Sequence, residues 1–101
     1  MQDWLENNYN EKLSLDNLAD LAKLGKKTLF RRFKKATGET PQLYLQKLRI
    51  EAAKRFLESN DMTFNQVTWE VGYSDASSFH KIFKQETGLT PISYREKFAM
   101  S

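Results

Sequence analysis

The sequence predicts an all-α protein of about seven helices, in which two similar halves are joined by one long helix. The 101 residues include only four glycines and two prolines, which favours helices over many short strands. An internal repeat predicts the two halves: Thr-Gly-Glu-Thr-Pro at residues 37–41 recurs as Thr-Gly-Leu-Thr-Pro at residues 87–91. Phenylalanine, lysine and tyrosine positions around this element recur at the same spacing of fifty residues.

The first half is expected to hold three helices, over about residues 3–9, 14–23 and 26–37. Ser14 can cap the second helix, and Gly25 starts the turn before the third. Apolar residues that recur at helical spacing are expected to face the core. In this half they are Trp4, Leu5, Leu15, Leu18, Leu21, Ala22, Leu29, Phe33 and Ala36.

The long helix is predicted over residues 41–59, and at 1.5 Å per residue it would span about 28 Å. Three more helices are expected after it, over about residues 64–71, 76–87 and from residue 91 onward. Thr63 can cap the first of these, while residues 72–75 form a turn and the next cap. The apolar positions of the long helix and of the helix over 76–87 include Leu43, Tyr44, Leu48, Ala52, Leu57, Phe79, Ile82 and Phe83. Trp69 is also expected in the core.

The repeated Thr-Gly-x-Thr-Pro element has the chemistry of a helix end followed by a helix start. Its glycine, residue 38 or 88, suits the left-handed position that ends a helix. Its second threonine can accept hydrogen bonds from free N–H groups at the start of the next helix. Its proline suits the first helical position, where a missing N–H costs nothing. Each copy therefore predicts the end of one helix, a short connection and the start of the next helix.

Positive charge is concentrated in one segment. The formal net charge is +3, but residues 1–22 carry −4, residues 23–35 carry +7 and residues 36–101 carry zero. Such a block predicts a polyanionic partner. A solvated helix face would have the same composition, so the block must also lie in a suitable motif.

Each half contains a helix, a short turn and a second helix of about twelve residues, which is the form of a helix-turn-helix unit. In that unit the second helix lies in the DNA major groove. At 100° per residue, the faces opposite the apolar residues carry Lys27, Arg31, Lys34 and Lys35 in the first half and Ser77, Lys81, Lys84 and Gln85 in the second. Ser78 lies at the edge of this face, and Phe30 and His80 correspond on its flank.

The chain resembles the DNA-binding domain of the AraC/XylS family of bacterial transcription regulators. The matching stretches are Leu-Ala-Asp-Leu-Ala at 18–22, Leu-Phe-Arg-Arg-Phe-Lys-Lys-Ala-Thr-Gly at 29–38, Leu-Arg-Ile-Glu-Ala-Ala-Lys at 48–54 and Val-Gly-Tyr-Ser-Asp-Ala-Ser-Ser-Phe at 71–79. The resemblance covers about residues 4–98. It implies two helix-turn-helix subdomains, residues 1–40 and 60–101, joined by a linker helix over residues 41–59.

The resemblance also implies which side chains meet DNA. The base-facing residues would be Lys27, Phe30 and Arg31 in the first unit, and Ala76, Ser77, Ser78 and Lys81 in the second. The side chains expected to contact phosphates are Lys26, Lys34, Lys35, Lys84 and Gln85. Gly25 stands where the first unit of this family usually has a Ser-like cap, so a looser start of that helix is expected.

The predicted function is sequence-specific binding of double-stranded DNA in successive major grooves, regulating bacterial transcription. We expect a cytoplasmic, nucleoid-associated protein, with RNA polymerase as a further partner and any effector acting only through a domain outside these residues. The chain would be the DNA-binding fragment of a longer regulator, a small stand-alone activator being the other option. A helical protein–protein interaction module without DNA binding is the alternative function.

Composition argues against several other classes. With no cysteine and a single histidine, His80, the chain has no disulfide, thiolate or His/Cys metal chemistry. Ser77 and Ser78 lie too close to His80 in sequence to form a triad with it, so no enzyme, cofactor or metal is expected. No run of 18 apolar residues predicts a membrane span. A membrane-surface helix at residues 23–35 is less favoured, because its apolar positions have counterparts in the second half.

Overall fold

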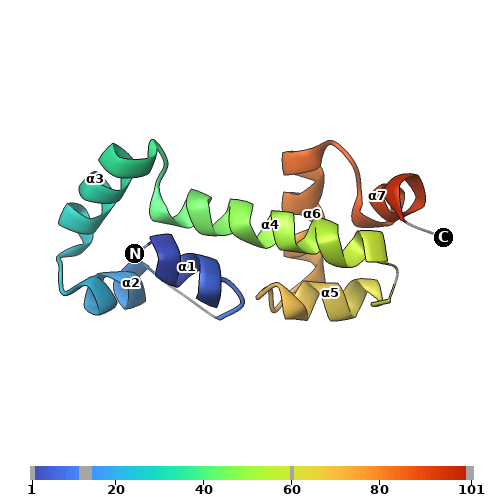
Figure 1. Ribbon diagram of the computed structural model, residues 1–101, viewed down its shortest axis with the longest axis horizontal. Helices are drawn as coiled ribbons and strands as arrows, with labels where there is room; N and C mark the ends of the chain where they lie inside the picture. Colours follow the sequence, from blue (N-terminus) through green and yellow to red (C-terminus); the bar gives the residue numbers. More distant parts are fainter. Residues whose placement is uncertain (1, 12–14, 60, 100–101) are drawn as a thin grey trace.

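The structure, a computed structural model, describes residues 2–11, 15–59 and 61–99 (Figure 1). Within these ranges the regular structure is entirely helical, which confirms the predicted all-α class. The helices are α1 Gln2–Asn8, α2 Leu15–Ala22, α3 Lys26–Thr37, α4 Pro41–Ser59, α5 Phe64–Glu70, α6 Ala76–Thr87 and α7 Pro91–Phe98. The molecule measures 46 × 22 × 21 Å. Figure 1 shows α1, α2 and α3 at one end and α5, α6 and α7 at the other, with α4 running between them.

Helix boundaries agree closely with the expected ones. The ranges of α3 and α4 are those predicted, and α1 and α2 each end about one residue early. Lys23 ends α2 in a left-handed conformation, with φ of 56°. Ser14, expected as the cap of α2, and the side chain of Leu15 lie outside the described residues.

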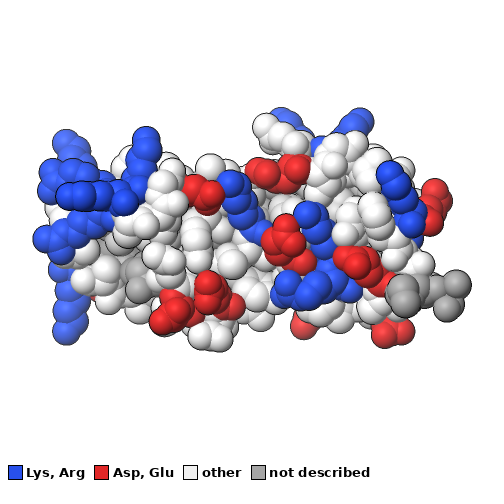
Figure 2. Space-filling model, turned by 45° about the horizontal axis from the view of Figure 1, so that its top comes forward, with Lys and Arg blue, Asp and Glu red and all other residues white. Residues whose placement is uncertain are grey.

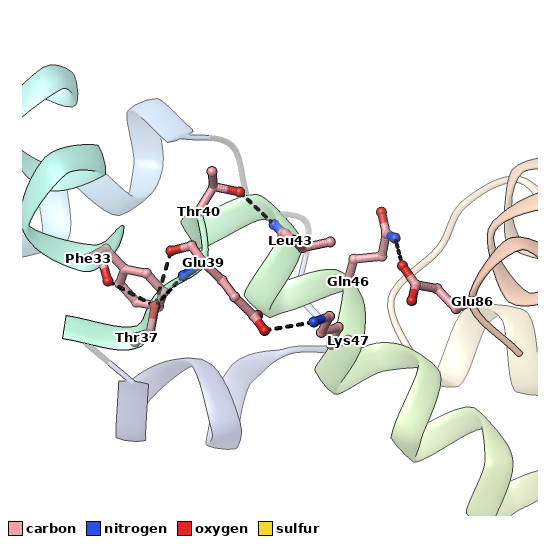
Figure 3. A network of polar contacts seen from close by, with 8 residues as sticks. All are labelled: Phe33, Thr37, Glu39, Thr40, Leu43, Gln46, Lys47 and Glu86. Carbon is pink, nitrogen blue, oxygen red and sulfur yellow. Dashed lines mark hydrogen bonds and ion pairs between the residues drawn. The ribbon is translucent and has the colours of Figure 1, made fainter. Parts of the chain in front are cut away.

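The repeated element forms the same hydrogen bonds in both copies. Gly38 and Gly88 both have φ of 81°, and their N–H groups donate to the carbonyl oxygens of Lys34 and Lys84. The hydroxyl of the second threonine accepts from a backbone N–H three residues on, at 3.1 Å in each copy. The first threonine also donates to a phenylalanine carbonyl at 2.8 Å in each copy. Figure 3 shows the first copy, where Thr37 and Thr40 join α3 to α4. The turn chemistry is thus local and duplicated.

Two clusters of buried side chains lie along α4. The N-terminal core consists of Leu5, Leu18, Ala19, Leu29, Phe33 and Leu45. The C-terminal core consists of Ile50, Ala52, Ala53, Leu57, Val67, Val71, Phe79 and Phe83. Helix α4 supplies residues to both, and Tyr9 packs against both. A bond of 2.7 Å from the Gln46 amide to the Glu86 carboxylate also joins α4 to α6 (Figure 3).

Besides Leu43 of α4, which is 36% exposed, three expected core residues are exposed. Leu21 is 52% exposed, because it lies about 110° from the centre of the face formed by Leu18, Ala19 and Ala22. Trp69 is 61% exposed, since the buried face of α5 is centred about 150° away. The predictions for these two residues were therefore wrong.

Ala36 is the third wrong prediction, for a different reason. It lies on the predicted face of α3, but that face borders an open hollow of about 510 Å³ whose rim includes Gln2 and Asp3. The last turn of α3 therefore extends beyond the packed part of the N-terminal core, and Ala36 is exposed.

Helix α7 is tied to the end of α4 by polar contacts. The Tyr94 hydroxyl donates to Glu58 Oε2 at 2.8 Å, and Arg95 Nε donates to the Leu57 carbonyl at 3.0 Å. Burial, together with the hydrogen bond to Glu58, raises the pKa of Tyr94 from its ordinary 10.0 to about 12. The folded protein therefore keeps a proton that the unfolded chain releases near pH 10.

This linkage predicts a pH dependence specific to Tyr94. Its contribution to stability is complete below pH 10 and declines as the pH rises toward about 12. Tyr94→Phe removes this titration, so the difference in free energy of unfolding between the wild type and the variant should shrink from pH 9 to pH 11.5. Urea unfolding at intervals across that range measures it. A difference that stays constant with pH would contradict the assigned contact.

Candidate nucleic-acid interface

The positive segment forms one surface at the α3 end of the molecule. Figure 2 shows Lys and Arg gathered at that end, whereas both signs are intermixed over the rest of the face in view. All seven cations of this surface are exposed: Lys23, Lys26, Lys27, Arg31, Arg32, Lys34 and Lys35. Among the described acidic side chains, one pairs with this group: Asp16 lies 3.1 Å from Lys26, and both are well exposed. An exposed pair of this kind is worth little and opens readily.

Helix α3 presents its predicted base-facing residues away from the N-terminal core. Leu29 and Phe33 are 3% and 5% exposed, and they fix the buried face. Arg31 lies about 180° from the centre of that face, pointing directly outward. The predicted residues that this arrangement brings together on one exposed helical surface are Lys27, Phe30, Arg31, Lys34 and Lys35. Lys26 is also exposed, but at the first helical position it lies on the side of the buried face, about 40° from its centre. Phe30 is 36% exposed, as its position on the flank requires.

Helix α6 repeats this arrangement over the C-terminal core. Phe79 and Phe83 are completely buried. The exposed face of α6 carries Ser77, Ser78, Lys81, Lys84 and Gln85, while Ala76 is half-buried at the first helical position. Its charge is lower than that of α3, so any contact it makes with DNA depends more on hydrogen bonds.

The two helices begin differently. Asp75 caps α6 by accepting from the Ser77 N–H at 3.1 Å and from the Ser78 hydroxyl at 2.8 Å. The bonds from Ser78 and Ser77 hold the pKa of Asp75 below its usual value, so the carboxylate stays charged. Helix α3 begins at Gly25 without any side-chain cap, as expected.

The Asp75 cap has a chemical consequence that the sequence analysis missed. Because Ser78 donates its hydroxyl proton to Asp75, the oxygen is left to accept from a ligand. Sequence reasoning identified the cap but not this second bond. The spacing could have indicated this bond, because a serine three residues after a capping aspartate lies on the first helical turn, within reach of the carboxylate.

The overall dimensions suit two contacts with one duplex. Figure 1 places α3 at the start of α4, whereas α6 crosses α4 between its middle and its C-terminal end. Successive major grooves on one face of B-DNA are about 34 Å apart. The molecule is 46 Å long, which exceeds this spacing. Over the described residues, no group of His, Cys, Asp and Glu side chains could hold a metal ion, and no helix is long and apolar enough to cross a bilayer.

Relatives in sequence agree on one family. A family model described as a helix-turn-helix domain matches residues 18–97. The transcriptional activator RhaS of Pectobacterium carotovorum is 37% identical over 94 residues, covering 93% of this chain and 34% of the relative. RhaS of Yersinia pestis is 37% identical over 95 residues, covering 94% and 35%. The chain thus spans about a third of the length of the curated relatives it matches.

Solved structures with a similar fold support the same family assignment. The C-terminal domain of AraT, a response regulator from Geobacillus stearothermophilus, has a TM-score of 0.95 at 25% identity, covering 99% of this chain and 84% of that one. The DNA-binding domain of AdpA, solved with a target DNA, has a TM-score of 0.91 at 27% identity, covering 95% and 86%. The family is one of DNA-binding regulators, not of enzymes. The chain belongs to the AraC/XylS family of transcription regulators, as a helix-turn-helix DNA-binding domain.

Proposed function

We propose that the domain binds double-stranded DNA by placing α3 and α6 in two successive major grooves on one face of the duplex, and so regulates bacterial transcription. The observation that carries this proposal is the duplication itself. Two helices with equivalent positions, each packed on its own core, expose polar faces, and both cores share α4. A single monomer could then read two half-sites.

In this proposal α3 supplies most of the charge and α6 most of the neutral contacts. Lys27, Phe30 and Arg31 face base edges from α3, while Lys26, Lys34 and Lys35 contact phosphates. Lys26 would have to leave its pair with Asp16 to do so. Ala76, Ser77, Ser78 and Lys81 face bases from α6, with Lys84 and Gln85 on phosphates.

We also propose that the binding units are residues 1–40 and 60–101, with residues 41–59 as the linker helix. The separate cores support this division, although Leu45 of the linker helix belongs to the N-terminal core. The RhaS relatives are transcriptional activators. By analogy, RNA polymerase would be a further partner, and an effector would act through a region outside these residues. Because the proposed target is chromosomal DNA, we propose that the domain acts in the bacterial cytoplasm, at the nucleoid.

Arg31 and Lys34 test the proposed roles against each other. A guanidinium group can donate two bonds to guanine O6 and N7, which specifies a base. Arg31→Ala should weaken binding to the best site by about 1–3 kcal/mol and relax preference at one or two adjacent base pairs. Lys34→Ala should weaken all sequences alike and flatten the salt dependence by about one unit.

Binding curves for both variants on a site selected from random duplex DNA, and on a scrambled duplex, make the comparison. Lys34→Ala serves as the matched control, since it removes a charge from the same helix. If Arg31→Ala weakens both duplexes equally, Arg31 contacts phosphate and base readout lies elsewhere. Binding to no duplex at all would contradict the proposed function.

A further inference from the structure

The two halves are joined by α4, and they also contact each other directly beside this helix. The chain after α1 lies against the turn after α5, where Gly72 has φ of +101°. A Cβ atom at Gly72 would lie 2.9 Å from the Tyr9 carbonyl oxygen and 3.0 Å from Asn10 Cα. These neighbours are backbone atoms of the other half and cannot swing aside. Glycine is therefore required by close approach as well as by conformation.

Arg49 fills the centre of this contact. It projects from the middle of α4 and is half-buried. Its Nε donates to the Tyr9 carbonyl at 2.7 Å, and its Nη2 donates to the Glu11 carbonyl at 2.6 Å. Its guanidinium carbon also lies 5.2 Å from the centroid of the Tyr73 ring. One planar group thus bonds to the first half while it stacks on the second.

The chemistry of this contact requires arginine specifically. The guanidinium group has a rigid fork of donors that can reach two carbonyl oxygens while its face covers an aromatic ring. A lysine ammonium group could keep the charge, but it lacks the planar fork. Burial lowers the pKa of Arg49 below its ordinary value, and the neighbouring Tyr73 offsets only part of this effect. The guanidinium group nevertheless remains charged at any physiological pH.

Rotation of one half relative to the other would break this contact, because its members come from both halves and from α4. Helices α3 and α6 project from opposite halves, so a small rotation at Gly72 and Arg49 moves one helix relative to the other. When two binding units are joined stiffly, the second adds affinity only if the spacing of the half-sites matches that of the units. The stiffness of this junction therefore affects which spacings are accepted.

We propose that Arg49 is a positioning residue that holds α3 and α6 in a fixed relation and so sets the half-site spacing that the domain accepts. This inference rests on the proposed two-groove binding. Without the fork, each half stays folded on its own core, but the relative orientation of the recognition helices broadens. The variant then binds the correct spacing less tightly and distinguishes it less sharply from a wrong one.

The first experiment measures spacing selectivity. One base pair inserted between the half-sites displaces the second by about 3.4 Å and about 35°. The wild type should then lose about 100-fold in affinity, whereas Arg49→Lys should lose about 10-fold or less. Arg55→Lys, an exposed arginine of the same helix, is the matched control and should behave as the wild type. Circular dichroism verifies that each variant is folded.

The second experiment needs no DNA. Because the chain has no cysteine, spin labels can be attached at Lys35→Cys and Gln85→Cys, on exposed positions of α3 and α6. The distance distribution between the labels should be narrow in the wild type and at least twofold broader with Arg49→Lys. Should Arg49→Lys unfold, Tyr73→Leu, which removes the ring beneath the guanidinium group, should give the same broadening.

The outcomes separate the two proposals. A folded Arg49→Lys variant with wild-type spacing selectivity and an equally narrow distribution would overturn the role of Arg49 alone. A wild type that binds duplex DNA without regard to spacing would overturn two-groove binding, while the label distances would still test the junction.

Discussion

Replacing Phe83 with Ala is expected to lower the free energy of unfolding by about 3–5 kcal/mol. Phe83 is completely buried, and its ring centroid lies 5.7 Å from that of Phe79 and 5.4 Å from that of Tyr94. The substitution removes the buried area, leaves a cavity and takes away two edge-to-face ring contacts. Such a loss is a large part of a typical stability of about 5–15 kcal/mol.

Urea unfolding of the variant measures this loss. Trp69→Ala is the control, since that larger ring is 61% exposed and should cost less than about 1 kcal/mol. Phe33→Ala applies the same test to the N-terminal core, where Phe33 is 5% exposed. A neutral result for either phenylalanine would show that its helix is oriented differently, and the face assigned to DNA would then be wrong too.

Binding to duplex DNA is expected to weaken steeply with salt. If the domain neutralises about six phosphates, the logarithm of the binding constant should fall with the logarithm of salt concentration with a slope near −5. Between 0.05 and 0.2 M salt, this slope corresponds to about a thousandfold loss of affinity. The physical basis is the release of counterions by the exposed cations around α3, with Lys81 and Lys84 added from α6.

Titrations at four or more salt concentrations give the slope. The double variant Lys34→Gln and Lys35→Gln should flatten it by about two units, because each lost phosphate contact removes about one. Lys97→Gln, which removes an exposed charge from α7, is the control and should leave the slope unchanged. A slope near zero for the wild type, with tight binding to a protein instead, would contradict DNA as the partner.

Features that depend on residues close together in the sequence were predicted correctly. The boundaries of α3 and α4 were predicted because Gly38, Thr40 and Pro41 act on their own backbone neighbourhood. The exposed faces of α3 and α6 were predicted because twelve residues contain enough turns to define a buried direction. The exposure of these two faces is therefore confirmed, while their contact with DNA stays a prediction.

The errors have an equally physical origin. Helices α2 and α5 contain eight and seven residues, so two or three apolar side chains leave the buried direction open, and Leu21 and Trp69 were misplaced. The junction at Arg49 was not predicted because its partners are backbone carbonyl groups 38 and 40 residues away in sequence. A carbonyl group carries no residue identity, so such a contact leaves no pattern to find.

The left-handed residues that follow α2 and α5 show that the two repeats cannot be exchanged. Lys23 and Gly72 occupy equivalent places, forty-nine residues apart, and both have positive φ. In the first copy this place is exposed and a lysine side chain is accommodated. In the second, the first copy itself occupies the space that a side chain would need. The two units share one pattern of helices, but their positions along the chain cannot be exchanged, since the second packs at Gly72 against the backbone of the first.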